Sequence, residues 1–367
     1  MGSEMCIRDR FTPEVLMQMW RLSTPVLSPD GKCYVYTRTL PNVKENSSTT
    51  EMVLSTLGKG GEKKVLPLKG HSPIFLDNET LAYISTEGAH AQVGIIKIDG
   101  TGKKALSDFD FDVTGFLFAP DRSKVIISRM VETPSIMRQE NPDLDKATGR
   151  IYDDLMYKHW DHWTLEYPQS YIAEVGEGLA ISQKLTNVLP EGESYELPIE
   201  PFGGIDQLAW HPNSKAIAYS CKKLKGLAYA RSTNTDIYLL DLTTGTTTNL
   251  TEGMMGYDNT PKFSSDGKYI AWTSMERDGY EADLNRLFMM NLGTKEKTFV
   301  TRDYELWVDQ FEWLEGDKGF RFLSNDQGLG NLFEIDIKSL KATKITDYEM
   351  ADVCLLYTSD AADDSLR

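Results

Sequence analysis

Residues Leu27-Ser28-Pro29-Asp30-Gly31-Lys32 read as a turn, and they lead directly into the β-rich run Tyr34-Val35-Tyr36-Thr37. The Asp-Gly pair is typical of a tight hairpin, because glycine adopts the positive φ that such a turn requires. The turn and the run after it recur five more times in degenerate form. These copies begin with the turns at residues 75–79, 119–124, 211–215, 264–268 and 315–319.

The spacing of the copies identifies the repeating unit. The turn aspartates or their equivalents lie at positions 30, 77, 121, 213, 266 and 317, so the steps between them are 47, 44, 92, 53 and 51 residues, one of them double. A second set of β-rich runs completes the later copies, at residues 236–242, 285–292 and 331–337. Each unit therefore holds about four short strands, and a four-stranded unit of about 45 residues is typical of a propeller blade.

A β-sandwich also contains many short strands, but it does not repeat its turn sequence at a fixed interval. We therefore predict an all-β fold, a β-propeller with six visible four-stranded blades over residues 11–352, from an incomplete seven- or eight-bladed ring. A ring without its closing strands has an unpaired edge, so we expect the isolated chain to associate.

The two ends differ from the middle. Met5-Cys6-Ile7-Arg8-Asp9 and the stretch from Cys354 to Asp363 resemble translated sequencing-adapter read-through. We therefore predict that residues 1–10 and 353–367 are a non-native leader and tail. The first ten residues also lack the apolar core of a secretory signal.

Composition excludes several classes of function. The 367 residues carry 39 Lys plus Arg against 55 Asp plus Glu, a formal charge of −16 that disfavours nucleic acid and anionic lipid as partners. No apolar run approaches the ~18 residues that cross a bilayer. Five histidines and four cysteines without a Cys-x-x-Cys pair leave little material for a metal site. We expect no metal, no cofactor and no membrane segment.

The doubled step contains an insertion, which we place at residues 131–169, between inner strands that end at Arg129 and outer strands that begin at Tyr171. Loops longer than ~15 residues in a compact fold are usually functional or disordered. Disorder is disfavoured here because aromatic residues are concentrated in the segment. They are Tyr152, Tyr157, Trp160, Trp163 and Tyr167.

Several chemistries can be weighed within the insertion. Residues 141–149 lack the glycine and the oxygen ligand that a calcium loop requires. His159 and His162 stand three residues apart, but without a third ligand a packing or hydrogen-bonding role is favoured over zinc. Asp153 and Asp154 are either a solvated face or a site for a cationic group such as a substrate amine. Our candidate substrate-binding residues are Asp153, Asp154, His159, Trp160, Asp161, His162 and Trp163.

A catalytic centre is not recognisable in the sequence. The chain has no Gly-x-Ser-x-Gly elbow, no phosphate-binding loop and no Gly-x-Gly-x-x-Gly motif. The nearest match, Gly70-His71-Ser72-Pro73-Ile74, has proline where a helix would begin, so it is interpreted as the start of the second blade. We predict no catalytic residue in this chain.

Three segments together carry a family resemblance: the repeated turn, the opening from Phe11 to Gly31, and Asp153-Asp154-Leu155-Met156-Tyr157-Lys158-His159-Trp160-Asp161-His162-Trp163. From about Phe11 to Asp352 the chain resembles the N-terminal propeller of the prolyl oligopeptidase family, in its bacterial dipeptidyl-peptidase V and acylaminoacyl-peptidase branch. The Ser-Pro-Asp-Gly-Lys turn alone is less specific, since the periplasmic protein TolB has similar blades.

The resemblance implies a function that the spacing does not. Family members attach an α/β-hydrolase domain with a serine nucleophile, and the propeller admits small or unstructured peptides and helps to grip their N-termini. The expected function is thus the substrate-gating domain of a serine exopeptidase that removes dipeptides or acylated residues, with peptides as partners and a homo-oligomer as an expectation for the intact protein. Export to the periplasm or medium is implied, with the cytoplasm left open. The alternative is a non-catalytic TolB-like propeller that binds a protein partner.

Overall fold

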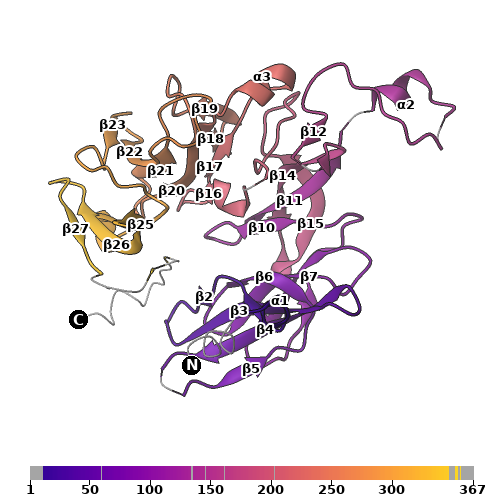
Figure 1. The fold of residues 1–367 in the computed structure, drawn as a ribbon, viewed down its shortest axis with the longest axis horizontal. Coiled ribbons are helices and arrows are strands. Elements are labelled where there is room, and N and C mark those ends of the chain that lie inside the picture. The colour runs from indigo at the N-terminus through magenta and orange to yellow at the C-terminus, as the bar shows by residue number, and fades with distance from the viewer. Residues whose placement is uncertain are drawn as a thin grey trace, which may run out of the picture. The chain divides into compact units, whose positions relative to one another are not determined.

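The computed structural model describes residues 11–58, 60–133, 135–144, 146–160, 162–201, 203–346, 352–353 and 356. The predicted leader at residues 1–10 and most of the predicted tail at 353–367 lie outside these residues. The described part is predominantly β, and the six predicted blades are all present as separate antiparallel sheets (Figure 1). The described residues divide into two compact units, 11–111 and 112–356.

The first unit contains blades 1 and 2. In blade 1, β1 and β2 both pair with β3, so that together they act as one interrupted inner strand. Blade 2 follows as a regular four-stranded sheet. The elements are α1 (Pro13–Met17), β1 (Arg21–Leu22), β2 (Val26–Leu27), β3 (Cys33–Asn42), β4 (Ser47–Thr56), β5 (Lys63–Val65), β6 (Gly70–Phe75), β7 (Thr80–Ser85), β8 (Gln92–Lys97) and β9 (Lys104–Ala105). The motif Gly70–Ile74 lies in β6, the first strand of blade 2, as predicted.

The second unit begins with blades 3 and 4. Blade 3 has the strand order β10-β11-β14-β15 and blade 4 the order β16-β17-β18-β19. The elements are β10 (Gly115–Phe118), β11 (Lys124–Glu132), α2 (Ile136–Glu140), β12 (Lys158–His159), β13 (His162–Trp163), β14 (Glu166–Val175), η1 (Glu177–Leu179), β15 (Ile181–Asn187), η2 (Ile205–Gln207), β16 (Leu208–Trp210), β17 (Ala216–Cys221), α3 (Gly226–Arg231), β18 (Asp236–Asp241) and β19 (Thr246–Asn249).

Blades 5 and 6 complete the second unit in the orders β20-β21-β22-β23 and β24-β25-β26-β27. Each predicted β-rich run after a turn is found in the second strand of its blade, and the second set of runs is found in the third strands. The elements are β20 (Asp258–Phe263), β21 (Tyr269–Ser274), β22 (Arg286–Asn291), β23 (Lys297–Phe299), β24 (Gln310–Trp313), η3 (Glu315–Asp317), β25 (Gly319–Asp326), β26 (Leu329–Asp336) and β27 (Ala342–Lys344).

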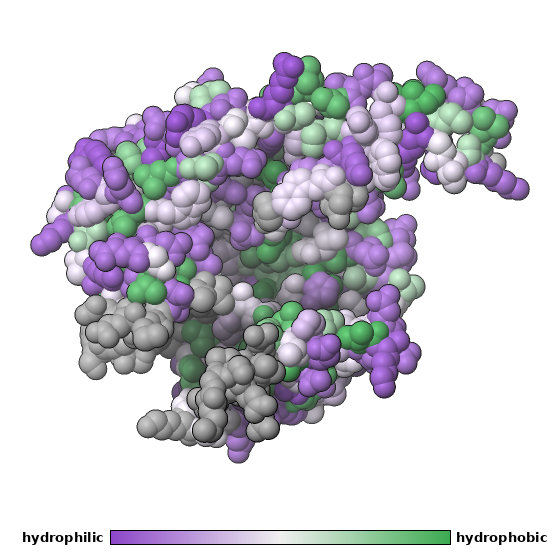
Figure 2. All heavy atoms as spheres, viewed as in Figure 1, coloured by the Kyte–Doolittle hydropathy of each residue, from purple (hydrophilic) through white to green (hydrophobic). Residues whose placement is uncertain are grey.

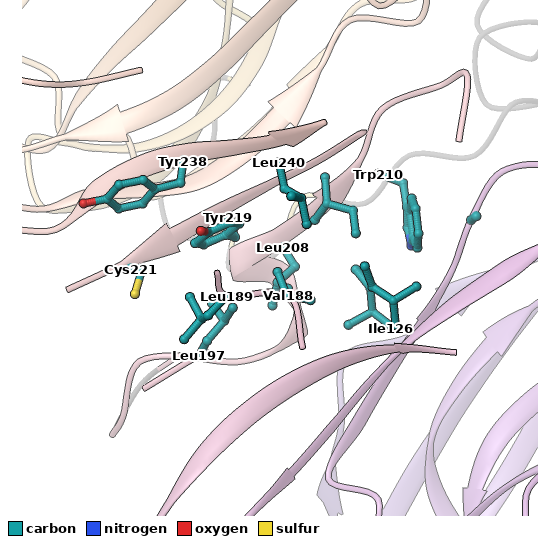
Figure 3. Close-up of a cluster of buried hydrophobic side chains, with 13 residues drawn as sticks. Ile126, Val188, Leu189, Leu197, Leu208, Trp210, Tyr219, Cys221, Tyr238 and Leu240 are labelled. Carbon is teal, nitrogen blue, oxygen red and sulfur yellow. The ribbon is translucent and has the colours of Figure 1, made fainter. Parts of the chain in front are cut away.

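The cores lie between neighbouring blades, because each sheet buries its apolar side chains against the next. In the first unit, Val35 and Met52 of blade 1 pack with Leu81 of blade 2. In the second unit, Ile126 of blade 3 packs in one cluster with Trp210 of blade 4 (Figure 3). Two further clusters join blade 4 to blade 5 and blade 5 to blade 6.

The repeated turn has two hydrogen-bonding tasks. Its Asp or Asn side chain accepts from the backbone N–H two residues later, as in Lys32 N to Asp30 Oδ1 at 3.1 Å and Lys215 N to Asn213 Oδ1 at 2.9 Å. The backbone N–H of the same Asp then donates to the turn of the next blade in the same unit, as in Asp30 N to Asn78 Oδ1 at 2.9 Å. The repeat is therefore also a link between blades.

The alignment of the sixth turn differs from the prediction. Asp317 accepts from Ser265 N at 2.8 Å and from Asp266 N at 3.2 Å. It therefore takes the place of Asn78 in blade 2, rather than that of the turn aspartate with which the sequence pattern aligned it. The sequence alignment of this turn is therefore off by one residue. Glycine at position 316 stands where the other turns have Asp or Asn, and Asp317 follows it.

The insertion is shorter than the predicted 131–169. Strands β11 and β14 stay paired as far as Glu132 opposite Glu166, so only residues 133–165 leave the sheet. The four predicted insertion residues from 166 onward belong to β14, which begins before Tyr171. Sequence patterning missed this because Glu166, Tyr167 and Pro168 do not form a typical strand sequence, although their backbone continues the hairpin.

Candidate functional site

The site residues come from two neighbouring blades of the second unit. Strands within a blade are antiparallel and follow each other in sequence, so the tight turns and the connections between second and third strands lie at opposite ends of the sheet. Residues 133–165 are this connection in blade 3, and residues 222–235, with α3, are the connection in blade 4. Both therefore lie at the same end, away from the repeated turns.

An open cavity of about 990 Å³ lies between the insertion and α3. This volume is in the range of small-molecule and peptide side-chain sites. The lining combines aromatic and leucine side chains with a few charged ones. The lining residues are Thr148, Arg150, Tyr152, Asp153, Asp154, Leu155, Tyr157, Trp163, Leu165 and Leu227. Figure 2 shows hydrophobic residues among hydrophilic ones over α3 and the insertion.

One hydrogen bond joins the insertion to α3 beside the cavity. The Asp154 carboxylate accepts from Leu227 N at 3.1 Å, at the start of α3, and from Leu155 N at 2.8 Å. Gly226 adopts φ +57°, and a Cβ atom there would lie 1.7 Å from Asp154 Oδ2. A glycine at position 226 is therefore required for the close approach of the two connections.

A polar cluster anchors α3 on its other side. The Tyr229 hydroxyl donates to Glu196, and the Lys222 ammonium lies 3.9 Å from the centroid of the Tyr229 ring. Burial raises the pKa of the Glu196 carboxyl and lowers the pKa of Lys222, which is 7% exposed. The hydrogen bond from Tyr229 to Glu196 and the contact of Lys222 with the Tyr229 ring therefore hold α3 against the segment before blade 4 and the end of β17.

The connection of blade 5 extends this arrangement. Asp278 accepts from Ser232 Oγ at 2.7 Å and from Thr233 N at 2.8 Å, both just after α3. The hydrogen bond from Ser232, together with those from backbone N–H groups such as that of Thr233, lowers the pKa of Asp278. Two carboxylates, Asp154 and Asp278, thus join the connections of three successive blades.

The structure brings together some of the candidate residues. Asp153, Asp154 and Trp163 line the cavity. Asp154 is engaged by the backbone of α3, whereas Asp153 makes no hydrogen bond or ion pair within the described part of the chain. His159 and Trp160 are not among the lining residues and contact each other, with ring centroids 6.5 Å apart. Asp161 and the side chain of His162 lie outside the described residues, although the His162 backbone pairs with His159 in a short hairpin.

Sequence reasoning named three of the ten lining residues as candidates and missed the other seven, among them Leu227 and Arg150. Leu227 is 73 residues from Asp154, and no pattern in the sequence connects the two. The relevant signal is structural: two connections of adjacent blades must be neighbours. Arg150 lies in a stretch without periodicity, so its place in the cavity wall is set by tertiary contacts.

No group of three or more His, Cys, Asp or Glu side chains among the described residues is arranged to hold a metal ion. None of the described helices has the length and apolar character needed to cross a membrane.

Five four-stranded sheets, and a first sheet in which β1 and β2 share one strand position, define this chain as a β-propeller domain. No protein-family model matches it. Dipeptidyl-peptidase 5 from Porphyromonas gingivalis is 42% identical over 341 residues, which cover 92% of this chain and 49% of that protein. Dipeptidyl-peptidase 5 from Porphyromonas endodontalis is 39% identical over 344 residues, with the same two coverages. The propeller is thus homologous to part of the dipeptidyl-peptidase 5 proteins.

Solved structures show the same fold at low sequence identity. Acylaminoacyl peptidase from Pyrococcus horikoshii has a TM-score of 0.63 and 16% identity, over 91% of this chain and 47% of that one. The β-propeller domain of the Trilobed protease from Pyrococcus furiosus has a TM-score of 0.56 and 16% identity, over 90% of this chain and 85% of that one. The chain spans about half the length of the curated relatives it matches.

Proposed function

We propose that this propeller is the substrate-gating domain of a serine exopeptidase that removes dipeptides from peptide N-termini. The homology to proteins named dipeptidyl-peptidase 5 carries the proposal. The resemblance in the repeated turns and the insertion supports it and supplies the serine chemistry, which would reside in a hydrolase domain. Export to the periplasm or medium is part of the proposal and rests on the same resemblance.

The cavity offers a chemical role in this function. Asp153 lines it with a carboxylate that is not engaged by other described residues, whereas the neighbouring Asp154 is occupied by α3. A free carboxylate beside apolar rings suits an ammonium group, since the rings lower the cost of desolvating the cation. We therefore assign Asp153 to the peptide's N-terminal amine.

The test is peptide binding by this chain, measured calorimetrically. A short peptide with a free amine should bind, and its N-acetylated form should bind at least about tenfold more weakly, because acetylation removes the charge that Asp153 recognises. Asp153→Asn should weaken binding of the free-amine peptide to the same extent. Asp143→Asn, a matched change at an exposed insertion residue outside the cavity, should leave binding unchanged. Equal affinity for both peptides would refute the assignment.

A further inference from the structure

The wall of the cavity is built from stacked rings. The centroids of Tyr152 and Tyr157 lie 5.7 Å apart, and Trp163 lies 6.5 Å from the first and 6.1 Å from the second. Trp163 remains 55% exposed and Tyr157 42% exposed, so the rings present an uncovered apolar face. Aromatic side chains of a ligand pack well on such a face.

The rest of the apolar lining is aliphatic and comes partly from another blade. Leu155 and Leu165 of the insertion and Leu227 of α3 line the cavity, and each is more than 40% exposed. Solvent-exposed leucines that converge on one concave surface with three rings are unusual on a protein surface. The position of Leu227 is fixed by the contact of its backbone with Asp154 and by the polar cluster around Tyr229.

A polar group in the wall also lacks a partner. The Tyr152 hydroxyl is buried and makes no hydrogen bond with any described residue. This hydroxyl is enclosed, so Tyr152 offers its ring rather than its oxygen to the cavity that it lines.

These observations assign a substrate class to the site. We propose that the cavity binds a large apolar side chain, aromatic above all, carried by the same N-terminal residue whose amine contacts Asp153. The inference rests on the proposed function, because it places the peptide's first residue here. The Asp153 carboxylate supplies the charge complementarity, and the rings and leucines hold the side chain.

The experiment compares free-amine peptides that differ only in their first residue, Phe, Leu, Ala or Gly, titrated into the full chain. We expect the peptide with Phe to bind about tenfold or more tightly than the one with Ala. Leu227→Ala should reduce this preference about five-fold, while Leu144→Ala, a matched change at an exposed insertion leucine outside the cavity, should not. Circular dichroism establishes that each variant is folded.

The possible outcomes separate the two proposals. If all free-amine peptides bind with the same affinity, the substrate class is wrong and the amine site stands. If no peptide binds, the proposed function of the site fails, and the inference fails with it. If the Phe preference survives Leu227→Ala unchanged, the side chain binds elsewhere and the inference is overturned.

Discussion

At the scale of single residues, burial sets the ionisation of one carboxyl group away from the cavity. Asp258 begins blade 5, is 1% exposed and accepts from Trp272 Nε1 at 3.3 Å. Burial raises its pKa to about 7, and hydrogen bonds from Ser274 and Thr251 oppose this rise. The neutral acid is therefore the favoured form within the folded sheet.

This shift predicts a pH dependence of stability with a definite sign. In the unfolded chain an Asp titrates near 3.9, so between about pH 4 and 7 the folded state binds the extra proton, and ionisation destabilises it as the pH rises. Asp258→Asn should therefore gain stability relative to the original chain across this window, by an amount on the order of a few kcal/mol at pH 8. Urea denaturation at several pH values measures the difference.

The exposed turn residue Asp241 provides the control. Its pKa is lowered by backbone hydrogen bonds, so Asp241→Asn should not reproduce the gain above pH 7. A difference between Asp258→Asn and the original chain that is constant from pH 4 to 8 would contradict the raised pKa.

At the scale of elements, two connections meet through a glycine. Gly226 and Gly245 both adopt positive φ, +57° and +71°, so alanine at either position introduces similar backbone strain, about 1–2 kcal/mol. They differ in their surroundings: a Cβ at 226 collides with Asp154, whereas a Cβ at 245 meets no atom within 4 Å. We expect both variants to melt at lower temperature, and only Gly226→Ala to lose peptide binding, by at least about tenfold.

Thermal denaturation and the peptide titration measure these two effects separately. Equal peptide affinity in the two glycine variants would show that the contact between Asp154 and α3 does not shape the cavity. The expected split between stability and binding would instead assign Asp154 a positioning role, unlike that of its neighbour Asp153.

Elements are also the scale at which sequence patterns succeed and fail. The blades were predictable because Asp30 and its equivalents stabilise a local turn, which requires similar residues in each copy. The end of the insertion at Glu166 was not predictable, because strand pairing there depends on the partner residue Glu132 rather than on local propensity. Asp153, Asp154 and Trp163 could be proposed as candidates because they lie close together in the sequence of the insertion. The contribution of Leu227 depends instead on how two blades pack.

At the scale of the whole molecule, one contact between an imidazole and a serine bears on whether this chain can hydrolyse peptides. An imidazole does contact a serine, since His71 Nδ1 lies 3.0 Å from Ser72 Oγ, but the two are neighbours on the exposed start of β6. A serine nucleophile needs a base that is oriented by a third group and donors that receive the oxyanion. A contact between adjacent residues on a strand does not supply them.

We therefore predict no hydrolysis of dipeptidyl or aminoacyl chromogenic substrates by the purified chain, even at high protein concentration. Continuous absorbance measurement over hours sets the limit. Turnover that disappears in Ser72→Ala would refute the prediction by identifying the nucleophile, and turnover that persists in this variant would refute it through a residue not recognised here.

The pairing of Glu132 with Glu166 has a consequence for how specificity can change. The segment between them leaves and rejoins the sheet at directly opposed backbone positions. Its length and composition therefore do not affect the pairing register of β11 with β14. Related proteins can exchange or rebuild this segment, and with it one wall of the cavity, as long as the graft retains a carboxylate able to accept from the backbone of α3.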